Sequence, residues 1–388
     1  MNIQTLQTHL LTLATLEDTG SPVVSCYLNL EAGHVTAKQA IEERVRLLRR
    51  TMPHSQRVSF DQAQTAIDCR IAAGFHAECR GAAIFARGGD PEFFLDLEFR
   101  VPLPTWIAVS STPCIYQLVE LKDNYDRYVL ILANEHNTRI LEVHLGTITD
   151  AMLKERPDLR DRIGSDWTRE HFQSHRREHD HQFANEVVRI TEEVMAAGKY
   201  GHLVLAGTLK MTALLRHALP KHLEAKLIDI VPAAGNQQTS DVVAASVARF
   251  LEEEQKESLA AVDKLQQEIC RHGLAVAGPG DSLRSLKNHQ VDMLVMASEF
   301  VPEPAWTCPE CDFAAIQPAR PAICPDCGGV KTRELDLKEE LVRLAELAGC
   351  DVEIVHDSDI LMQLGGVGCL LRFRIPAPQT KPSAVTHG

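Results

Sequence analysis

Two apolar segments near the middle of the chain decide the fold: YVLILANEHNTRILEVHLG at residues 128–146 and GHLVLAGTLKMTALL at residues 201–215. The first contains two short apolar runs with a turn at Asn137 between them, which predicts a pair of strands. The second predicts a strand followed by a helix, and a charged helix over 170–198 precedes it. A further strand is expected at 226–233. Strands that alternate with helices favour an α/β layer around a mixed sheet.

The same alternation recurs toward both ends of the chain. With 388 residues the chain is too long for one ordinary core, so we divide it into domains. We predict three α/β domains, at residues 1–125, 126–245 and 246–376, with a cysteine-rich insert in the C-terminal domain. The last residues, 377–388, are Pro-rich and polar and predict a disordered tail.

Composition excludes several classes of protein. The apolar fraction is 45%, the charged fraction is 24% and the net charge is −13, which is typical of a globular protein and unlike one that coats nucleic acid nonspecifically. The sequence has no apolar tract of about 18 residues that could span a membrane. The N-terminus lacks the basic and apolar regions of a secretion signal. We therefore expect a cytoplasmic protein with reduced cysteines and no membrane partner.

The predicted helix over 37–52 carries several arginines. Ile41 and Met52 belong to its expected apolar face, and Arg44, Arg46, Arg49 and Arg50 lie elsewhere on it. These arginines could contact RNA. The acidic neighbours in the same helix favour an ordinary solvated face, so no function is assigned to them.

Residues 154–181, here called the tip segment, form a basic exception in the acidic chain. From Lys154 to Arg177 there are seven Lys or Arg against five Asp or Glu. A glycine-containing loop leads into a histidine-rich helix here, and the segment lies between the two apolar segments of the middle domain. Arginine suits phosphate contacts through its planar donor fork, and Trp167 could stack on an unpaired base. A solvated helix face, with Trp167 covering its own helix, is the alternative.

Histidines recur every four residues in the tip segment. His171, His175 and His179 would share one side of a helix, which makes a metal site geometrically feasible. Carboxylates alternate with them and no H-E-x-x-H motif is present. Surface histidines, some near RNA, are therefore the preferred interpretation.

The cysteine-rich insert at residues 306–330 is the most specific pattern in the chain. Cys308 and Cys311 form one C-x2-C pair, Cys324 and Cys327 form another, and twelve residues separate the pairs. Two such knuckles complete a tetrahedral zinc ribbon. Because four protein ligands leave no open position for water, we predict a structural zinc ion; a redox pair or cysteines without a metal are the alternatives.

The C-terminal stretch LAELAGCDVEIVHDSDILMQLGGVGCLLRFRI resembles the end of the class-one translation release factors of archaea and eukaryotes and of Pelota. Their Gly-Gly-Ile-Gly run and following strand are matched at Gly365, Gly366, Gly368, Leu371, Arg372, Phe373 and Arg374. The zinc ribbon and the segment 201–219 are also similar. The resemblance spans residues 126–376, and the chain looks like the Balon-like ribosome hibernation factors among the bacterial members.

The tip segment departs from that family. Release factors carry Gly-Gly-Gln there, and this sequence has Ile163-Gly164-Ser165-Asp166-Trp167 instead. Some bacterial relatives resemble Gly-Trp-Ser-Gln followed by Tyr-Gln-x-His. Against that pattern Arg169 replaces the first glutamine, and the matching residues are Trp167, Thr168, Phe172, Gln173 and His175. The codon-reading Asn-Ile-Lys-Ser motif is also absent. We assign no catalytic residue, and we predict RNA contacts from these tip residues: Arg160, Arg162, Gly164, Trp167, Arg169, His171, Gln173, His175, Arg176 and Arg177.

The resemblance implies a ribosome-associated translation factor that occupies the A site in hibernation or rescue. Its expected partners are rRNA near the peptidyl-transferase centre, ribosomal proteins and a translational GTPase. One alternative is a peptidyl-tRNA hydrolase or release factor in which Gln173 or His175 positions or activates water. Another is a scaffold that binds only protein, consistent with the acidic composition.

Overall fold

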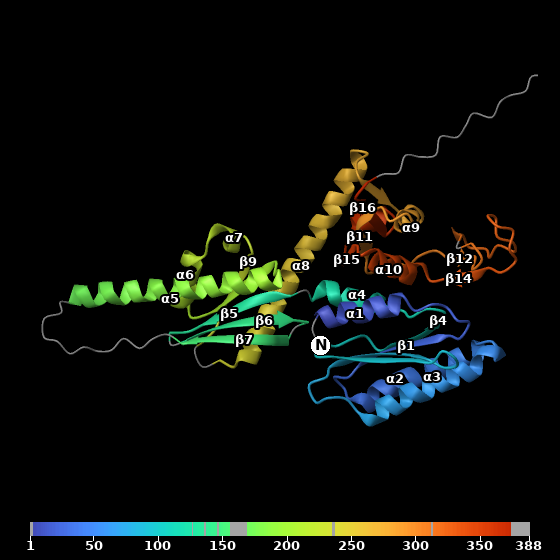
Figure 1. Cartoon of the computed structure of the whole chain (residues 1–388), viewed down its shortest axis with the longest axis horizontal. Coiled ribbons are helices and arrows are strands. Elements are labelled where there is room, and N and C mark those ends of the chain that lie inside the picture. Colours follow the sequence, from blue (N-terminus) through green and yellow to red (C-terminus); the bar gives the residue numbers. More distant parts are fainter. Residues whose placement is uncertain are drawn as a thin grey trace, which may run out of the picture. The chain divides into compact units, whose positions relative to one another are not determined.

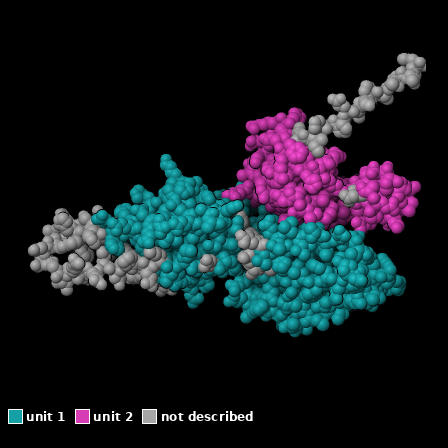
Figure 2. Space-filling view, viewed as in Figure 1, with its two compact units in different colours: residues 1–256 teal, residues 257–388 magenta. Residues whose placement is uncertain are grey.

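The computed structural model describes residues 3–125, 127–135, 137–145, 147–155, 169–234, 237–311 and 313–373. The chain divides into two compact units, residues 1–256 and 257–388 (Figure 2). Across the described residues, unit 1 contains a four-stranded and a five-stranded sheet, and unit 2 contains a four-stranded and a three-stranded sheet. The predicted α/β class is confirmed. The division into three domains stays a prediction.

The first sheet of unit 1 is antiparallel, with the strand order β3-β2-β1-β4. Its strands are β1 (Val23–Asn29), β2 (Gly81–Arg87), β3 (Phe93–Phe99) and β4 (Trp106–Ser110). The helices of this region are α1 (Ile3–Ala14), α2 (His34–Thr51), α3 (His54–Ala73) and α4 (Tyr116–Asn124). Helices α2 and α3 pack on the sheet through one apolar core that includes Ile41 and Met52 (Figure 1). The apolar face expected for the helix over 37–52 is therefore confirmed.

The second sheet of unit 1 has the order β7-β6-β5-β8-β9 and is mixed. Its strands are β5 (Tyr128–Ala133), β6 (Asn137–His144), β7 (Thr147–Glu155), β8 (His202–Gly207) and β9 (Leu227–Pro232). The helices that accompany it are α5 (Arg169–Gly198), α6 (Leu209–Ala218), α7 (Lys221–Glu224) and α8 (Thr239–Cys270). Strand β5 pairs antiparallel with β6, to which a short turn joins it. It pairs parallel with β8, and the connection between these two strands includes α5. The predicted mixed sheet is confirmed.

Both faces of this second sheet are covered. On one face, Val129 and Ile131 share a core with side chains of α5 and α6. On the other face, the rings of Tyr128 and Phe250 stack with centroids 4.8 Å apart, and the Tyr128 hydroxyl lies 2.7 Å from Ser246 Oγ. Burial raises the pKa of Tyr128, although the hydrogen bond with Ser246 partly offsets this. Two covered faces explain why β5 and β8 are almost continuously apolar.

The larger sheet of unit 2 has the order β10-β16-β11-β15. Its elements are β10 (Ala275–Ala277), α9 (Pro279–Lys287), β11 (Val291–Ala297), α10 (Leu337–Ala348), β15 (Asp351–Val355), α11 (Asp359–Gln363) and β16 (Val367–Leu371). The ends of α10 follow from its caps: the Asp336 carboxylate accepts a hydrogen bond from Glu339 N, and Gly349 adopts the left-handed conformation. The strand predicted over 368–375 is shorter than expected, because β16 ends at Leu371.

The glycines before and within β16 have a steric reason. Gly366 has a φ of +75°, and a Cβ added there would lie 2.5 Å from the Phe300 ring. A Cβ on Gly368 would lie 2.7 Å from a methyl group of Leu265. The glycine run that resembles the release factors thus allows close packing in unit 2.

The insert begins after β11 and ends before α10, which leads to β15 of the larger sheet. It contains a small antiparallel sheet of β12 (Ala305–Thr307), β13 (Ala314–Ile316) and β14 (Arg333–Leu335), in the order β13-β12-β14. Strands β12 and β14 frame the predicted ribbon at 306–330, and β13 lies between its two cysteine pairs. None of the helices within the described ranges is long and apolar enough to cross a membrane.

Candidate metal centre and the helix of the tip segment

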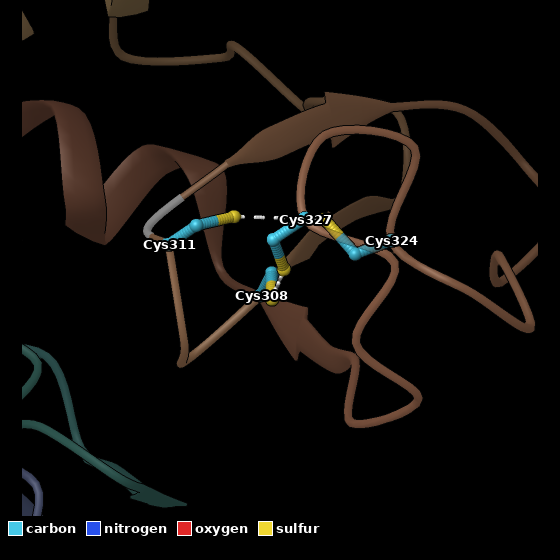
Figure 3. Close-up of side chains that lie close together, drawn as sticks. All are labelled: Cys308, Cys311, Cys324 and Cys327. Carbon is cyan, nitrogen blue, oxygen red and sulfur yellow. Dashed lines mark hydrogen bonds between the residues drawn. The ribbon is translucent and has the colours of Figure 1, made fainter.

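The four cysteines of the insert lie together (Figure 3). The sulfur atoms of Cys308 and Cys327 are 3.6 Å apart, as are those of Cys311 and Cys324, and all four lie within 4.8 Å of one another. A disulfide requires about 2.05 Å between sulfurs, so these distances describe free thiols. Thiolates at about 2.3 Å from a tetrahedral zinc ion are about 3.8 Å apart, which is close to the observed spacing.

The backbone of each knuckle folds around its cysteines. Cys308 N donates to Phe313 O at 2.8 Å, and Cys324 N donates to Gly329 O at 2.7 Å. The first C-x2-C pair thus follows β12 and the second precedes β14. Cys308 and Cys324 are only 1% and 2% exposed, respectively, so one sulfur of each pair points inward.

Repulsion among the four sulfurs when they ionise favours a bound cation. Hydrogen bonding to the backbone of Cys327 lowers the pKa of the Cys324 thiol to about 7. At Cys311 a backbone hydrogen bond with Phe313 acts in the same direction, but desolvation and the three neighbouring thiols outweigh it and raise the pKa to about 12. Four thiolates this close repel one another, so all four can ionise together only around a positive ion. The donor set and the spacing both fit a metal such as zinc.

A second set of contacts braces the insert beside the cysteines. The Arg320 guanidinium lies over the Trp306 ring at 5.9 Å and donates to Thr332 Oγ1 at 3.1 Å. The Trp306 indole N–H donates to Gln317 O at 3.0 Å. These contacts hold the chain around the cysteine cluster in place, and the four sulfurs are the donors that a metal ion would take.

The predicted RNA contacts of the tip segment fall into two groups. Arg160, Arg162, Gly164 and Trp167 lie outside the described residues. The others lie in the first turns of α5, which the structure describes by its backbone: Arg169, His171, Gln173, His175, Arg176 and Arg177. Strand β7 runs to Glu155 and α5 begins at Arg169. The helix predicted over 170–198 is confirmed.

The backbone of α5 starts well before the residues that anchor this helix in the core. Among the α5 side chains that the structure describes, Phe183 is the first in the apolar core, and a carboxylate oxygen of Asp180, one turn earlier, lies 3.8 Å from Lys210 Nζ. At 1.5 Å per residue, Arg169 lies about 21 Å along the helix from Phe183. Figure 1 shows the N-terminal turns of α5 extending past the strands. The helix therefore carries its first turns beyond the sheet that anchors it.

Comparison with known proteins relates the middle of the chain to one family. Residues 113–251 match the model of bacterial archaeo-eukaryotic release factor family 10. The peptide chain release factor subunit 1 of Pyrococcus abyssi (strain GE5 / Orsay) is 29% identical over 136 residues, which covers 29% of this chain and 33% of that protein. The match thus spans about a third of the curated relative.

Solved structures of similar proteins cover more of the chain at lower identity. The archaeal translation termination factor aRF1 is 13% identical, with a TM-score of 0.28 over 96% of this chain and 99% of that chain. Archaeal Pelota, in a model with ABCE1 on the ribosome, is 12% identical, with a TM-score of 0.40 over 96% of this chain and 95% of that chain. The segment that contains β5 to β9 and the tip is therefore similar in sequence to a bacterial family of release-factor relatives.

Proposed function

We propose that this protein is a ribosome-associated factor of release-factor or Pelota-like architecture that occupies the A site without hydrolysing peptidyl-tRNA. The observation that carries the proposal is the match of residues 113–251 to a release-factor family, in a chain whose sequence contains no Gly-Gly-Gln. The proposed setting is hibernation or rescue of ribosomes, in the manner of the Balon-like group.

The anchoring of α5 supports a binding role for the tip. Its inner part is fixed by the apolar core from Phe183 onward, and its outer turns carry Arg169, Arg176 and Arg177 about 9 to 21 Å from that point. Guanidinium groups on a rigid helix are suited to phosphate oxygens of rRNA. In the proposed complex the tip lies near the peptidyl-transferase centre.

The lack of Gly-Gly-Gln argues against hydrolysis. In the release factors that this chain resembles, that motif positions water on the ester bond of peptidyl-tRNA. This chain has a different sequence at that place, which includes Asp166 and Trp167. A tip that fills the same space without positioning water would block the site. The result is protection or occupancy rather than turnover.

The cysteine centre has a structural part in this proposal. A zinc ion bound by Cys308, Cys311, Cys324 and Cys327 would hold the two knuckles together, because a small sheet of three short strands cannot supply a core of its own. The region around it is proposed to engage ribosomal protein or a translational GTPase.

Co-sedimentation with ribosomes tests the proposal. The chain should move with ribosomes from stationary-phase or cold-stressed cells, and Arg176→Gln combined with Arg177→Gln should reduce the bound fraction, since it removes two cations from α5. The matched control is Arg189→Gln combined with Arg216→Gln, which changes the net charge equally at exposed positions of α5 and α6. A chain found only at the top of the gradient contradicts the proposal.

A further inference from the structure

Four arginines from two neighbouring helices of unit 1 line one cavity. Arg46, Arg49 and Arg50 come from the last turns of α2, and Arg57 comes from the first turn of α3. The cavity has a volume of about 350 Å³. Among the described residues its lining contains these guanidinium groups and no carboxylate. Like charges gathered around an empty space make it favourable for an anion to enter.

The turn between the two helices fixes this cluster. Met52, which follows α2, is buried in the apolar core of the first sheet. The Arg57 guanidinium donates to Met52 O at 3.3 Å and to Arg50 O at 3.4 Å, so it binds carbonyl groups at the end of α2. The cluster is therefore part of the helix–helix connection and is held by the packing beneath it.

Nearby carboxylates compensate only part of the positive charge. Arg49 donates to both oxygens of Asp61, at 2.7 and 2.8 Å, and this pairing lowers the pKa of Asp61. Arg46 lies 3.3 Å from Glu42. The Arg50 side chain has neither a hydrogen bond nor an ion pair within the described part of the chain, and Arg57 contacts carbonyl groups and the His54 ring. Two of the four guanidinium groups, those of Arg50 and Arg57, thus have no carboxylate in contact, although Arg57 lies close enough to Asp61 to help lower its pKa.

We propose that Arg46, Arg49, Arg50 and Arg57 form a binding site for the phosphate groups of an RNA chain. Guanidinium groups bind phosphate oxygens through paired N–H donors. The lining offers no aromatic ring or amide that would recognise a base, so the site binds the backbone independently of sequence. This inference adds a second RNA contact to unit 1 and does not depend on the proposed occupancy of the A site.

Binding of a short fluorescent single-stranded RNA, followed by anisotropy, tests the site with the full chain. Arg50→Gln should weaken binding several-fold and make the slope of log K against log salt less steep by about 0.7, the value for one lost phosphate contact on a single strand. Arg44→Gln is the matched control: Arg44 is exposed on the same helix and does not line the cavity. Equal effects of the two substitutions, or no effect of Arg50→Gln, overturn the proposal.

A second pair of variants tests for an increase in RNA affinity. Asp61→Asn releases Arg49 from its carboxylate and should strengthen RNA binding. Asp68→Asn changes the net charge equally, but Asp68 pairs with Lys38 at 3.0 Å away from the cavity lining, so binding should change little. If both substitutions strengthen binding equally, the effect is one of overall charge and the site is excluded.

Competition with inorganic pyrophosphate separates an RNA chain from a small phosphate compound. Without pyrophosphate, the RNA should bind the wild-type chain and raise the anisotropy. Excess pyrophosphate should displace the RNA and lower the anisotropy again. Pyrophosphate binding that Arg50→Gln abolishes, in a chain that does not bind RNA, refutes the RNA assignment. These experiments measure the binding of free RNA. A negative result would reject the arginine site but would not affect the co-sedimentation test of the proposed function.

Discussion

Loss of one cysteine of the metal centre should open the insert and leave the rest of unit 2 folded. Cys324→Ser replaces a thiolate that lies 3.6 Å from Cys311 Sγ, and a hydroxyl group is a poor substitute as a zinc ligand. Structural zinc contributes roughly 10–16 kcal/mol of apparent binding free energy in zinc-finger peptides. Strands β12, β13 and β14 have three residues each and cannot replace that contribution.

The expected loss of stability in the insert can be measured by hydrogen exchange at single backbone amides. If the substitution lowers the local stability of the insert by only about 3 kcal/mol, exchange of its protected amides should accelerate roughly a hundredfold. The amides to follow are Cys308 N, which donates to Phe313 O, and Gly328 N, which donates to Cys324 O. Ala297 N, which donates to Gly366 O in the larger sheet, should keep its protection.

Metal analysis and hydrogen exchange provide the assay. The wild-type chain should retain one zinc ion after gel filtration, and Cys324→Ser should retain much less. Cys270→Ser is the control, because Cys270 is an exposed cysteine of α8 outside the cluster. Unchanged zinc content in Cys324→Ser, or a reduced wild-type chain that binds no zinc and still protects the amides of the insert, would refute the reasoning.

Three other predictions concern unit 2 and the tip. Gly366→Ala should lower the free energy of unfolding by about 1–3 kcal/mol because of its positive φ and the nearby Phe300 ring, whereas Gly280→Ala within α9 should be neutral or stabilising, and denaturant titration compares them. Burial raises the pKa of Glu353, which accepts a hydrogen bond from Ser258 Oγ at 2.5 Å, so its contribution to stability is present at low pH and is lost as the pH rises through the raised pKa. Glu353→Gln should therefore stabilise the protein more at about pH 8 than at about pH 4, and an equal effect at both values contradicts this account. The wild-type chain should hydrolyse peptidyl-tRNA on ribosomes only at the background rate, and Gln173→Ala and His175→Ala should not change that rate. Hydrolysis by the wild-type chain that either substitution abolishes would establish the hydrolase alternative.

Strands and helices with buried, periodic faces could be predicted from the sequence. The apolar runs of β5 and β8 and the mixed sheet were predicted because both faces of that sheet are covered. Strand β7 was not predicted, since it lies at the sheet edge and leaves Met152 and Leu153 46% and 55% exposed. Helix α1 was also overlooked, although Leu6, Leu10 and Leu13 are buried at helical spacing and gave a usable signal.

The two candidate sites differ in how much their sequence reveals. The four-cysteine cluster was predicted, because the C-x2-C spacing is itself the geometry that brings Cys308 and Cys311 together, and a structural zinc ion in it stays a prediction. The basic cavity was not predicted. Arg46, Arg49 and Arg50 look like a solvated helix face until α3 packs beside α2, and only that packing adds Arg57 to them. Tertiary contacts between helices are not visible in the periodicity of either helix.

A cryo-EM map of the protein bound to a ribosome tests the central proposal most directly. We expect density for α5 and the tip segment in the A site near the peptidyl-transferase centre, with the ester bond of any P-site peptidyl-tRNA intact. Density for the chain at another ribosomal site, or a tip in the A site beside a hydrolysed peptidyl-tRNA, would contradict it.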